Sequence, residues 1–196
     1  MKELLIATYN PGKFLEITEA MAGISVKPIF LRDLGVDNFG LAEDGVSFRE
    51  NAEKKALFFA EKTGMLTMAE DSGIVVDALA GELGVTTRRW GAGENASDQE
   101  WIEFFMKRMR DESLRTAKFV CCACLKGDGV FEFFEGETWG KITERLEAPI
   151  IPGLPLSSCF LPEGCNEVYA AMSESEKNKI SHRGKAMRAV AEFLSD

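Results

Sequence analysis

Acidic side chains stand side by side at two places in the first half of the chain. Glu43 and Asp44 come just before a predicted helix, and Glu70 and Asp71 follow Met65–Ala69, an apolar run that predicts a short buried strand. Magnesium ions in proteins are held by one or two carboxylates together with substrate phosphates, and open α/β sheets bind ligands beyond the carboxyl ends of strands. The Glu70–Asp71 pair is therefore a candidate metal site, with a solvated acidic loop as the alternative.

A second group of residues, Thr8 to Lys13, joins a strand-like run to the start of a predicted helix. Free backbone N–H groups and the helix dipole favour an anion at such a junction. Lys13 adds a positive charge, and Thr8 and Asn10 add polar side chains. The segment lacks the second glycine and the Lys-Ser/Thr pair of a P-loop. It is a candidate phosphate site, and an ordinary strand–helix turn is the alternative.

Positive charge gathers near the C-terminus. The segment from Lys177 to Arg183 places a lysine, the only histidine and an arginine around Ser181, where the last helix is expected to begin. Cations are mildly unfavourable at that end of a helix. This local concentration of positive charge therefore indicates an anion-binding or base-reading site, with a solvent-facing basic stretch as the alternative. Arg88 and Arg89 have the chemistry to clamp a phosphate, but the sequence favours structural pairing for them.

Alternating strand-like and helix-like segments must position these groups. Strands are predicted over residues 2–8, 25–31, 65–69, 116–125 and 130–136, and helices beginning near Pro11, Ser47, Ser97 and Ser181. Ser47 with Glu50, and Ser97 with Glu100, have capping-box spacing. Gly73 is expected to let the chain turn sharply after the acidic pair, and residues 147–164 are expected to form a loop. The alternation predicts one α/β domain over residues 1–196, with a mixed sheet.

Composition narrows the class of protein. The chain has 196 residues, 45% of them hydrophobic, and 32 acidic against 23 basic side chains give a net charge of −9. Such a balance disfavours nucleic-acid binding, and the sequence has neither an 18-residue apolar run nor a signal segment. The five cysteines form no regular framework and are expected to be free and mostly buried. We therefore expect a cytoplasmic protein without nucleic-acid or membrane partners.

Several blocks of the sequence, taken in order, resemble the inosine/xanthosine triphosphate pyrophosphatases, enzymes that remove nonstandard purine nucleotides. The blocks are Thr8-Tyr9-Asn10-Pro11-Gly12-Lys13, residues 43–56, residues 69–79, residues 84–96 and residues 176–183. The resemblance covers nearly the whole chain. It implies an elongated two-lobed α/β domain with a central mixed β-sheet flanked by helices, an active-site cleft between the lobes, and a homodimer.

The resemblance also implies an activity and its residues. The reaction is Mg²⁺-dependent hydrolysis of ITP, dITP or XTP to the monophosphate and pyrophosphate, with Asp71 as general base. Glu43, Glu70 and Asp71 are the implied metal ligands. The implied substrate-binding residues are Thr8, Asn10, Lys13, Ser72, Gly153, Leu154, Leu156, Ser157, Lys177, His182 and Arg183. Among them, Lys177, His182 and Arg183 would read the base, as donors suited to a 6-oxo group.

One block departs from the family. Members usually carry Gly-aromatic-Gly-aromatic-Asp-Pro, where this chain has Gly153-Leu154-Pro155-Leu156-Ser157-Ser158. The change removes two aromatic rings, each able to contribute roughly 1–3 kcal/mol by base stacking, and one acceptor for a base N–H. Two alternatives follow: a pyrophosphatase with a different or broader base preference, and a nucleotide-binding protein without turnover. The retained acidic residues speak against the second.

Overall fold

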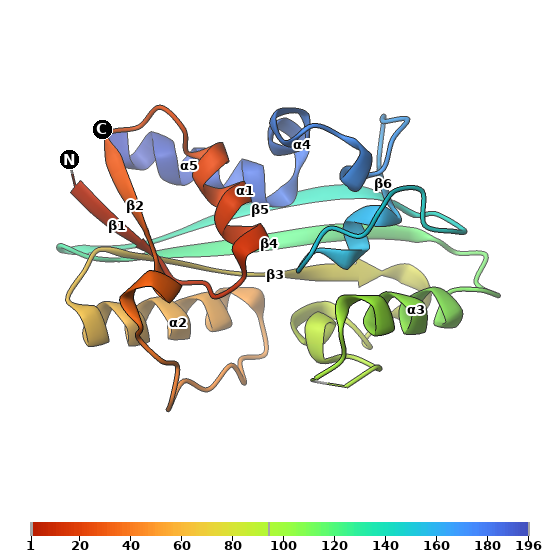
Figure 1. The fold of residues 1–196 in the computed structure, drawn as a ribbon, viewed down its shortest axis with the longest axis horizontal. Helices are drawn as coiled ribbons and strands as arrows, with labels where there is room; N and C mark the ends of the chain where they lie inside the picture. Colours follow the sequence, from red (N-terminus) through yellow and green to blue (C-terminus); the bar gives the residue numbers. More distant parts are fainter. Residues whose placement is uncertain (1, 94, 196) are drawn as a thin grey trace.

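The computed structural model describes residues 2–93 and 95–195. Within them, six strands form one mixed sheet in the order β2-β1-β3-β4-β5-β6 (Figure 1). The strands are β1 (Lys2–Ile6), β2 (Val26–Phe30), β3 (Thr67–Val76), β4 (Thr116–Gly127), β5 (Val130–Ile142) and β6 (Phe160–Pro162). β1 runs parallel to β2 and β3, whereas β3, β4, β5 and β6 pair antiparallel in succession.

Helices cover both faces of this sheet. They are α1 (Pro11–Ala20), α2 (Phe48–Thr63), α3 (Asp98–Arg108), α4 (Glu174–Ile180) and α5 (His182–Ser195). In Figure 1, α1, α4 and α5 lie above the sheet and α2 and α3 lie below it. None of the described helices is both long enough and apolar enough to cross a membrane.

The helix boundaries follow from local sequence signals. The side chain of Asn10 accepts a hydrogen bond from the third residue of α1, and Pro11 takes the first helical position, where its missing N–H costs nothing. Ser97 and Glu100 form the predicted capping box at the start of α3. Gly64 ends α2 in the left-handed conformation that glycine adopts readily.

Two local features differ from the sequence predictions. The capping box predicted at Ser47 is half formed, because the Glu50 carboxylate accepts from the N–H of Val46 instead of that of Ser47. The predicted loop over residues 147–164 contains the short strand β6, which pairs with the end of β5 and is too short to show a period in the sequence.

A helix that was not predicted, α4, changes the setting of Lys177. It begins with a capping box of Ser173 and Glu176, a pattern that is visible in the sequence. Lys177 lies in the last turn of this helix, where the dipole favours a cation, and the final helix α5 starts only at His182. The predicted start of the last helix near Ser181 is correct to within one residue, but Lys177 belongs to the helix before it.

The third strand is longer than predicted. It does not end at Ala69 but continues to Val76, because β4 pairs with it along its whole length. Glu70 and Asp71 thus lie inside a strand, where successive side chains point to opposite faces. The prediction that they sit at a strand end is wrong.

Gly73 also lies within β3 and makes no turn, contrary to the prediction. Its lack of a side chain serves close packing instead. A Cβ atom at this position would lie 2.5 Å from the carbonyl oxygen of Gly84 and 2.7 Å from the hydroxyl oxygen of Thr87. The segment 84–89 therefore packs directly against the backbone of the strand.

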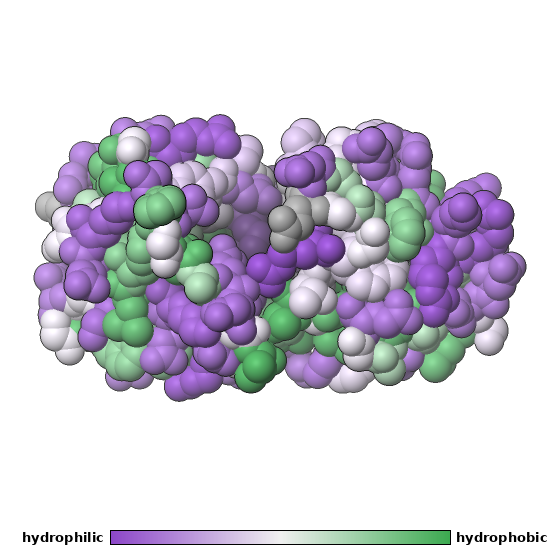
Figure 2. Space-filling view, turned by 90° about the horizontal axis from the view of Figure 1, so that it is seen from below, coloured by the Kyte–Doolittle hydropathy of each residue, from purple (hydrophilic) through white to green (hydrophobic). Residues whose placement is uncertain are grey.

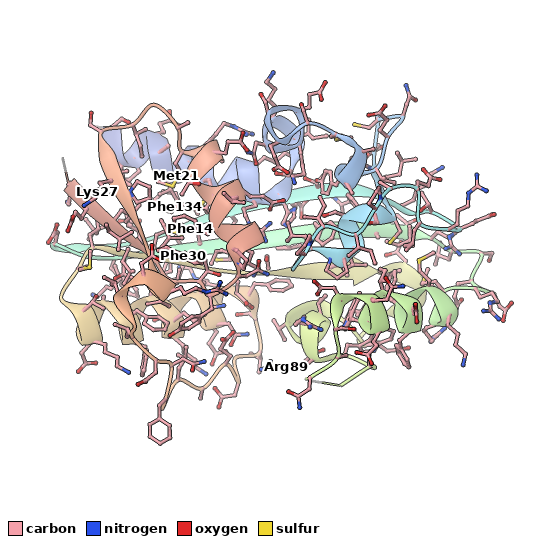
Figure 3. The ribbon with its side chains drawn as sticks, in the orientation of Figure 1. Phe14, Met21, Lys27, Phe30, Arg89 and Phe134 are labelled. Atoms are coloured by element: carbon pink, nitrogen blue, oxygen red, sulfur yellow. The ribbon has the colours of Figure 1, made fainter. Side chains whose placement is uncertain are left out.

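Three clusters of buried apolar side chains divide the molecule into two lobes. In the first lobe, Phe14, Met21 and Phe134 belong to a cluster between α1, α5 and the sheet (Figure 3). Phe59 belongs to a second cluster, between α2 and the sheet. The second lobe packs around Trp101 and neighbouring aromatic rings. Strands β3, β4 and β5 run through both lobes (Figure 1). The predicted elongated, two-lobed mixed α/β architecture is confirmed.

Candidate active site

A cavity of about 440 Å³ opens between the lobes, along one edge of β3. Within the described residues, β1 pairs with β3 at Thr67 and Met68 alone. Beyond Met68, the residues Glu70 to Gly73 border the cavity, so side chains from both faces of the strand reach it. At Ile74 the strand edge is covered again, because its N–H donates to the hydroxyl of Thr87 at 3.1 Å. Figure 2 shows the hollow between the two halves of the molecule, with hydrophilic residues in its depth.

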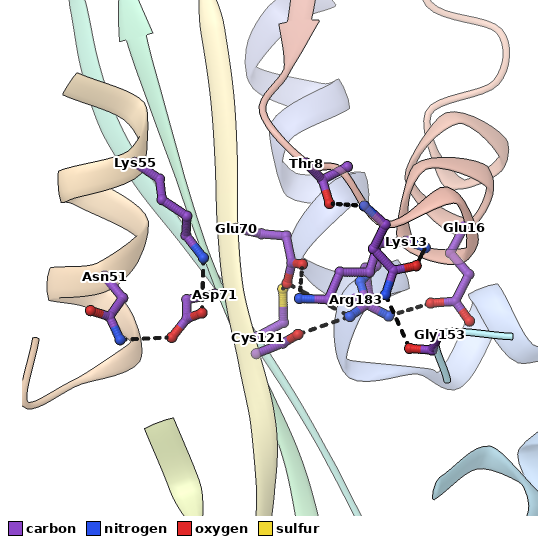
Figure 4. A network of polar contacts seen from close by, with 12 residues as sticks. Thr8, Lys13, Glu16, Asn51, Lys55, Glu70, Asp71, Cys121, Gly153 and Arg183 are labelled. Atoms are coloured by element: carbon purple, nitrogen blue, oxygen red, sulfur yellow. Dashed lines mark hydrogen bonds and ion pairs between the residues drawn. The ribbon is translucent and has the colours of Figure 1, made fainter. Parts of the chain in front are cut away.

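Asp71 faces α2. Its Oδ1 atom lies 2.9 Å from Nζ of Lys55, and its Oδ2 atom accepts from Nδ2 of Asn51 at 3.2 Å (Figure 4). Glu43 approaches the same lysine, with Oε2 at 3.3 Å from Nζ. Burial lowers the pKa of Lys55, but the charges of Asp71, Glu43 and Glu70 outweigh it and raise that pKa above its usual value. Lys55 is therefore an ammonium ion shared by two carboxylates.

Glu70 points the other way, toward α1 and α5. Its Oε1 atom lies 2.6 Å from Nζ of Lys13, and its Oε2 atom lies 3.7 Å from Nη2 of Arg183. Arg183 also donates from Nη2 to the hydroxyl of Ser72 at 2.8 Å. Burial raises the pKa of Glu70, but Lys13, Arg183 and Lys55 outweigh it and hold that pKa well below its usual range.

Glu16 completes a line of buried charges. Its Oε1 atom lies 2.7 Å from Nζ of Lys177, and its Oε2 atom accepts from Arg183. Both cations are almost fully buried, and a buried charge is tolerated only with a partner. Ion pairs therefore run without interruption from Lys177 through Glu16, Arg183 and Glu70 to Lys13.

His182 also lines the cavity, and its imidazole lies flat against an aromatic ring. Its imidazole stacks on Phe119 with 4.6 Å between centroids and 13° between planes. Nδ1 has no hydrogen-bond partner among the described residues. Burial, and after it the charge of Arg183, lower the pKa of His182 well below its usual value. His182 is therefore a neutral imidazole, with its buried Nδ1 left without a protein partner in the described part of the chain.

The altered block joins this site from the loop before β6. Leu154, Leu156 and Ser157 line the cavity. The carbonyl of Gly153 accepts from Nδ2 of Asn10 at 3.1 Å, which ties this loop to the segment at residues 8–13. The two leucines supply apolar but not aromatic surface to the cavity.

Every residue singled out from the sequence for catalysis, substrate binding or metal binding lines this one cavity. Their roles stay predictions. Sequence reasoning gave no role to Asn51, Lys55 or Glu16. A signal was present for the first two, because Asn51 and Lys55 are one helical turn apart.

Arg88 and Arg89 also line the cavity, and they bond to backbone carbonyls. Arg88 donates to the carbonyl oxygen of Ala96 at 2.6 Å, and Arg89 donates to that of Glu43 at 3.0 Å. Figure 3 places Arg89 in the space between α2 and α3. These contacts are consistent with the structural role that the sequence favoured.

Carboxylates in the cavity are candidate ligands for a metal ion. In the described part of the chain, no three His, Cys, Asp or Glu side chains group closely enough to hold one. Glu43 and Asp71 nevertheless converge on one positive charge, that of Lys55. Two carboxylates directed at one cationic position fit Mg²⁺, which takes one or two carboxylates beside substrate phosphates. Glu70, on the opposite face of β3, stays a predicted ligand only.

Charge in the cavity differs from that of the whole chain. Six cationic and four acidic side chains line it, whereas the protein carries a net charge of −9. The cationic ones are Lys13, Lys55, Arg88, Arg89, Lys177 and Arg183. An excess of positive charge in a recess attracts anions from solution, so the cavity suits a polyanionic small molecule.

Comparison with known proteins identifies the family. The sequence model of the Ham1 family matches residues 4–193. The dITP/XTP pyrophosphatase of Thermus thermophilus is 37% identical to the chain over 198 residues, covering 99% of this chain and 92% of that protein. The dITP/XTP pyrophosphatase of Deinococcus deserti is 35% identical over 191 residues, covering 96% and 88%. The predicted resemblance to these pyrophosphatases is confirmed.

Solved structures agree with the sequence comparisons. The Ham1 protein of Staphylococcus aureus superposes with a TM-score of 0.81 at 31% identity, covering 98% of each chain. A HAM1 protein from Coxiella burnetii gives 0.82 at 30% identity, covering 99% of this chain and 98% of that one. Fold, sequence and cavity lead to one conclusion: the chain belongs to the Ham1 family.

Proposed function

We propose that this protein hydrolyses nonstandard purine nucleoside triphosphates, namely ITP, dITP and XTP, to the monophosphate and pyrophosphate. One observation carries the proposal: a single cavity joins a cationic segment at a helix start, a buried carboxylate held by Lys55, and the neutral imidazole of His182. The relatives named dITP/XTP pyrophosphatases support it.

The triphosphate lies along the first lobe in this proposal. Lys13 and the backbone N–H groups at the start of α1 bind phosphate oxygens, because the helix dipole adds to the lysine charge there. Lys13 is held in place by Glu70 at 2.6 Å. Ser72, which accepts from Arg183, lies on the same face of β3 as Glu70 and adds a polar contact.

Asp71 removes the proton from the water molecule whose attack breaks the linkage between the α- and β-phosphates. A carboxylate suits this role when it is fixed beside the reacting centre, and Asn51 and Lys55 fix Asp71. We further propose that Mg²⁺ is held by Glu43 and Asp71, with Glu70 as a third candidate ligand. When bound, the ion would neutralise phosphate charge and make the water more acidic.

In this proposal, His182 and the residues near it in the sequence select the base. Its neutral imidazole and the buried cations Lys177 and Arg183 offer donors to a 6-oxo group. Adenine presents an amino group at that position and would leave such donors unpaired, which is how hydrogen-bonding sites discriminate. Leu154 and Leu156 replace the aromatic rings expected there, and this favours the second candidate function, a pyrophosphatase with a broader base preference.

We also propose that the protein acts as a homodimer in the cytoplasm. The resemblance stated above implies the dimer. The free cysteines fit a reducing compartment, since disulfides are rare there. Sedimentation of the purified protein at micromolar concentration tests the dimer directly.

A substrate panel tests the proposed function. The protein is incubated with Mg²⁺ and ITP, XTP, dITP, ATP, GTP or dTTP, and kcat/KM is measured for pyrophosphate release. The leading proposal expects the highest values for ITP, XTP and dITP. Equal values for all six would support the broader preference, and binding without any product would support a nucleotide-binding protein without turnover.

Replacing Asp71 by Asn tests the catalytic base. Asn keeps the shape and the contact with Lys55 but takes up no proton. We expect turnover of ITP to fall on the order of 10²- to 10⁴-fold, while calorimetry detects largely unchanged nucleotide binding. Full activity in the variant would remove Asp71 from the mechanism.

A further inference from the structure

Gly153 is held from both sides of the cleft. Its N–H donates to Oδ2 of Asp98 at 2.6 Å, and its carbonyl accepts from Nδ2 of Asn10 at 3.1 Å. Asn10 caps α1 in the first lobe, and Asp98 is the first residue of α3 in the second. The loop before β6 is thus fastened between two helix starts that belong to different lobes.

The contact between Gly153 and Asn10 leaves no space for a side chain at position 153. Gly153 has φ +78°, and a Cβ atom there would lie 2.6 Å from Oδ1 of Asn10. On the other segment, a Cβ atom at Gly12 would lie 2.9 Å from the carbonyl oxygen of Pro152 and 3.3 Å from the side chain of Leu154. The segment at residues 8–13 and the loop at 152–157 therefore touch backbone to backbone.

The hydrogen bonds that cap helix α3 do not involve the carboxylate of Asp98. Ser97 and Glu100 already satisfy the start of this helix through their capping box. The nearest cation, Arg88, lies 3.9 Å away and is half exposed, so it contributes little. The strongest contact of Asp98 is its charge-assisted hydrogen bond to the Gly153 N–H, and such bonds are about twice as strong as neutral ones.

We propose that Asp98 is a positioning residue for substrate binding. Its carboxylate fixes the loop Gly153–Ser157 against the segment at residues 8–13, so that one nucleotide meets the base-side and phosphate-side contacts together. The inference rests on the proposed function, because it assigns the loop to the base and the segment at residues 8–13 to the triphosphate. It predicts that Asp98 acts on nucleotide binding without touching the nucleotide.

Comparing a ligand that has a base with one that has none separates this positioning role from a general structural role. The Asp98→Ala variant is compared with the parent protein in the affinity for ITP and for inorganic tripolyphosphate, which has no base. Both affinities are measured by calorimetry in an Asp71→Asn background, where turnover is expected to be slow. We expect ITP affinity to fall about tenfold, equivalent to about 1.4 kcal/mol, and tripolyphosphate affinity to stay unchanged. In the active protein, KM for ITP should rise by the same factor with kcat little changed.

Two further variants serve as controls. Asp98→Asn keeps a neutral acceptor for the Gly153 N–H and should lie between the parent and Asp98→Ala. Gln99→Ala changes an exposed residue of the same helical turn, whose side chain bonds to Glu103, and should leave both affinities unchanged.

Several results would overturn the inference. Unchanged ITP affinity in Asp98→Ala, or an equal loss for ITP and tripolyphosphate, would show that Asp98 does not position the base side. These outcomes differ from a failure of the proposed function, in which the wild-type protein would release no pyrophosphate from ITP. A wild-type protein that bound no ITP at all would overturn both.

Discussion

His182 is a buried, neutral imidazole in a protein whose unfolded chain would protonate it in mildly acidic solution. Its pKa is held well below the usual value by burial and by the nearby charge of Arg183. Below about pH 6.5 the unfolded chain binds a proton that the folded protein does not. The stability that comes from keeping His182 neutral is therefore complete above that pH and is lost as the pH falls.

This linkage gives a measurable pH dependence. We expect the free energy of unfolding to decrease below about pH 6.5 by up to about 1.4 kcal/mol per pH unit from this one group. Denaturant unfolding of the wild-type protein and of His182→Gln, which cannot titrate, should show a stability difference that changes between pH 7.5 and pH 5.5. A constant difference would contradict the account. The depressed pKa of Glu70 acts only at lower pH, where its carboxylate becomes protonated, so it does not interfere.

Single residues were the most predictable part of the site. The resemblance to a known family assigned Asp71, Lys13 and Arg183 to one site, and these three residues line one cavity, while their roles stay predictions. Glu16 could not be found in the same way. Its function as the partner of Lys177 and Arg183 depends on how closely α1, α4 and α5 approach one another, and no local pattern in the sequence encodes that distance.

At the scale of elements, β3 shows where sequence reasoning stops. The apolar run ends at Ala69, so a strand end was predicted there, yet the strand continues through Glu70 and Asp71 to Val76. Cross-strand pairing with β4 decides its length. The cavity comes from the neighbour on the other side, β1, which stops short. The acidic pair thus sits at an open strand edge. Predicting this edge requires the register of β3 with both of its neighbours.

The junction of α4 and α5 depends on a glycine. A Cβ atom at Gly184 would overlap the carbonyl oxygen of Asn178 and lie 2.7 Å from its carbonyl carbon, and both atoms belong to the backbone of the chain just before the junction. Lys177 and Arg183 flank this contact in sequence. Close packing of the two helices therefore brings the two cations to the same carboxylate, that of Glu16.

Gly184→Ala tests this packing. The added methyl group must push α5 away from α4, and we expect a loss of about 1–3 kcal/mol in the free energy of unfolding, together with a higher KM for ITP. Denaturant unfolding gives the first quantity. Glu192→Ala, on the exposed face of the same helix, is the control and should change neither. An unchanged unfolding midpoint in Gly184→Ala would show that the junction tolerates separation.

At the scale of the whole molecule, two lobes share the strands β3, β4 and β5 and enclose one cavity. The alternation of elements and the resemblance to a known family were enough to predict this α/β architecture. The location of the cavity was less predictable, because it needs the packing of α1 and α2 on opposite faces of one sheet. An acidic protein thereby gathers six cationic side chains around this recess, where they can face the phosphates of a nucleotide.

The central claim is that this cavity cleaves a 6-oxopurine nucleoside triphosphate between the α- and β-phosphates. The most direct measurement is the identity of the phosphorus products when the wild-type protein acts on ITP in the presence of Mg²⁺. Our account predicts IMP and pyrophosphate in equal amounts, with no orthophosphate as a primary product and much slower release from ATP. Orthophosphate and IDP as the first products would contradict it.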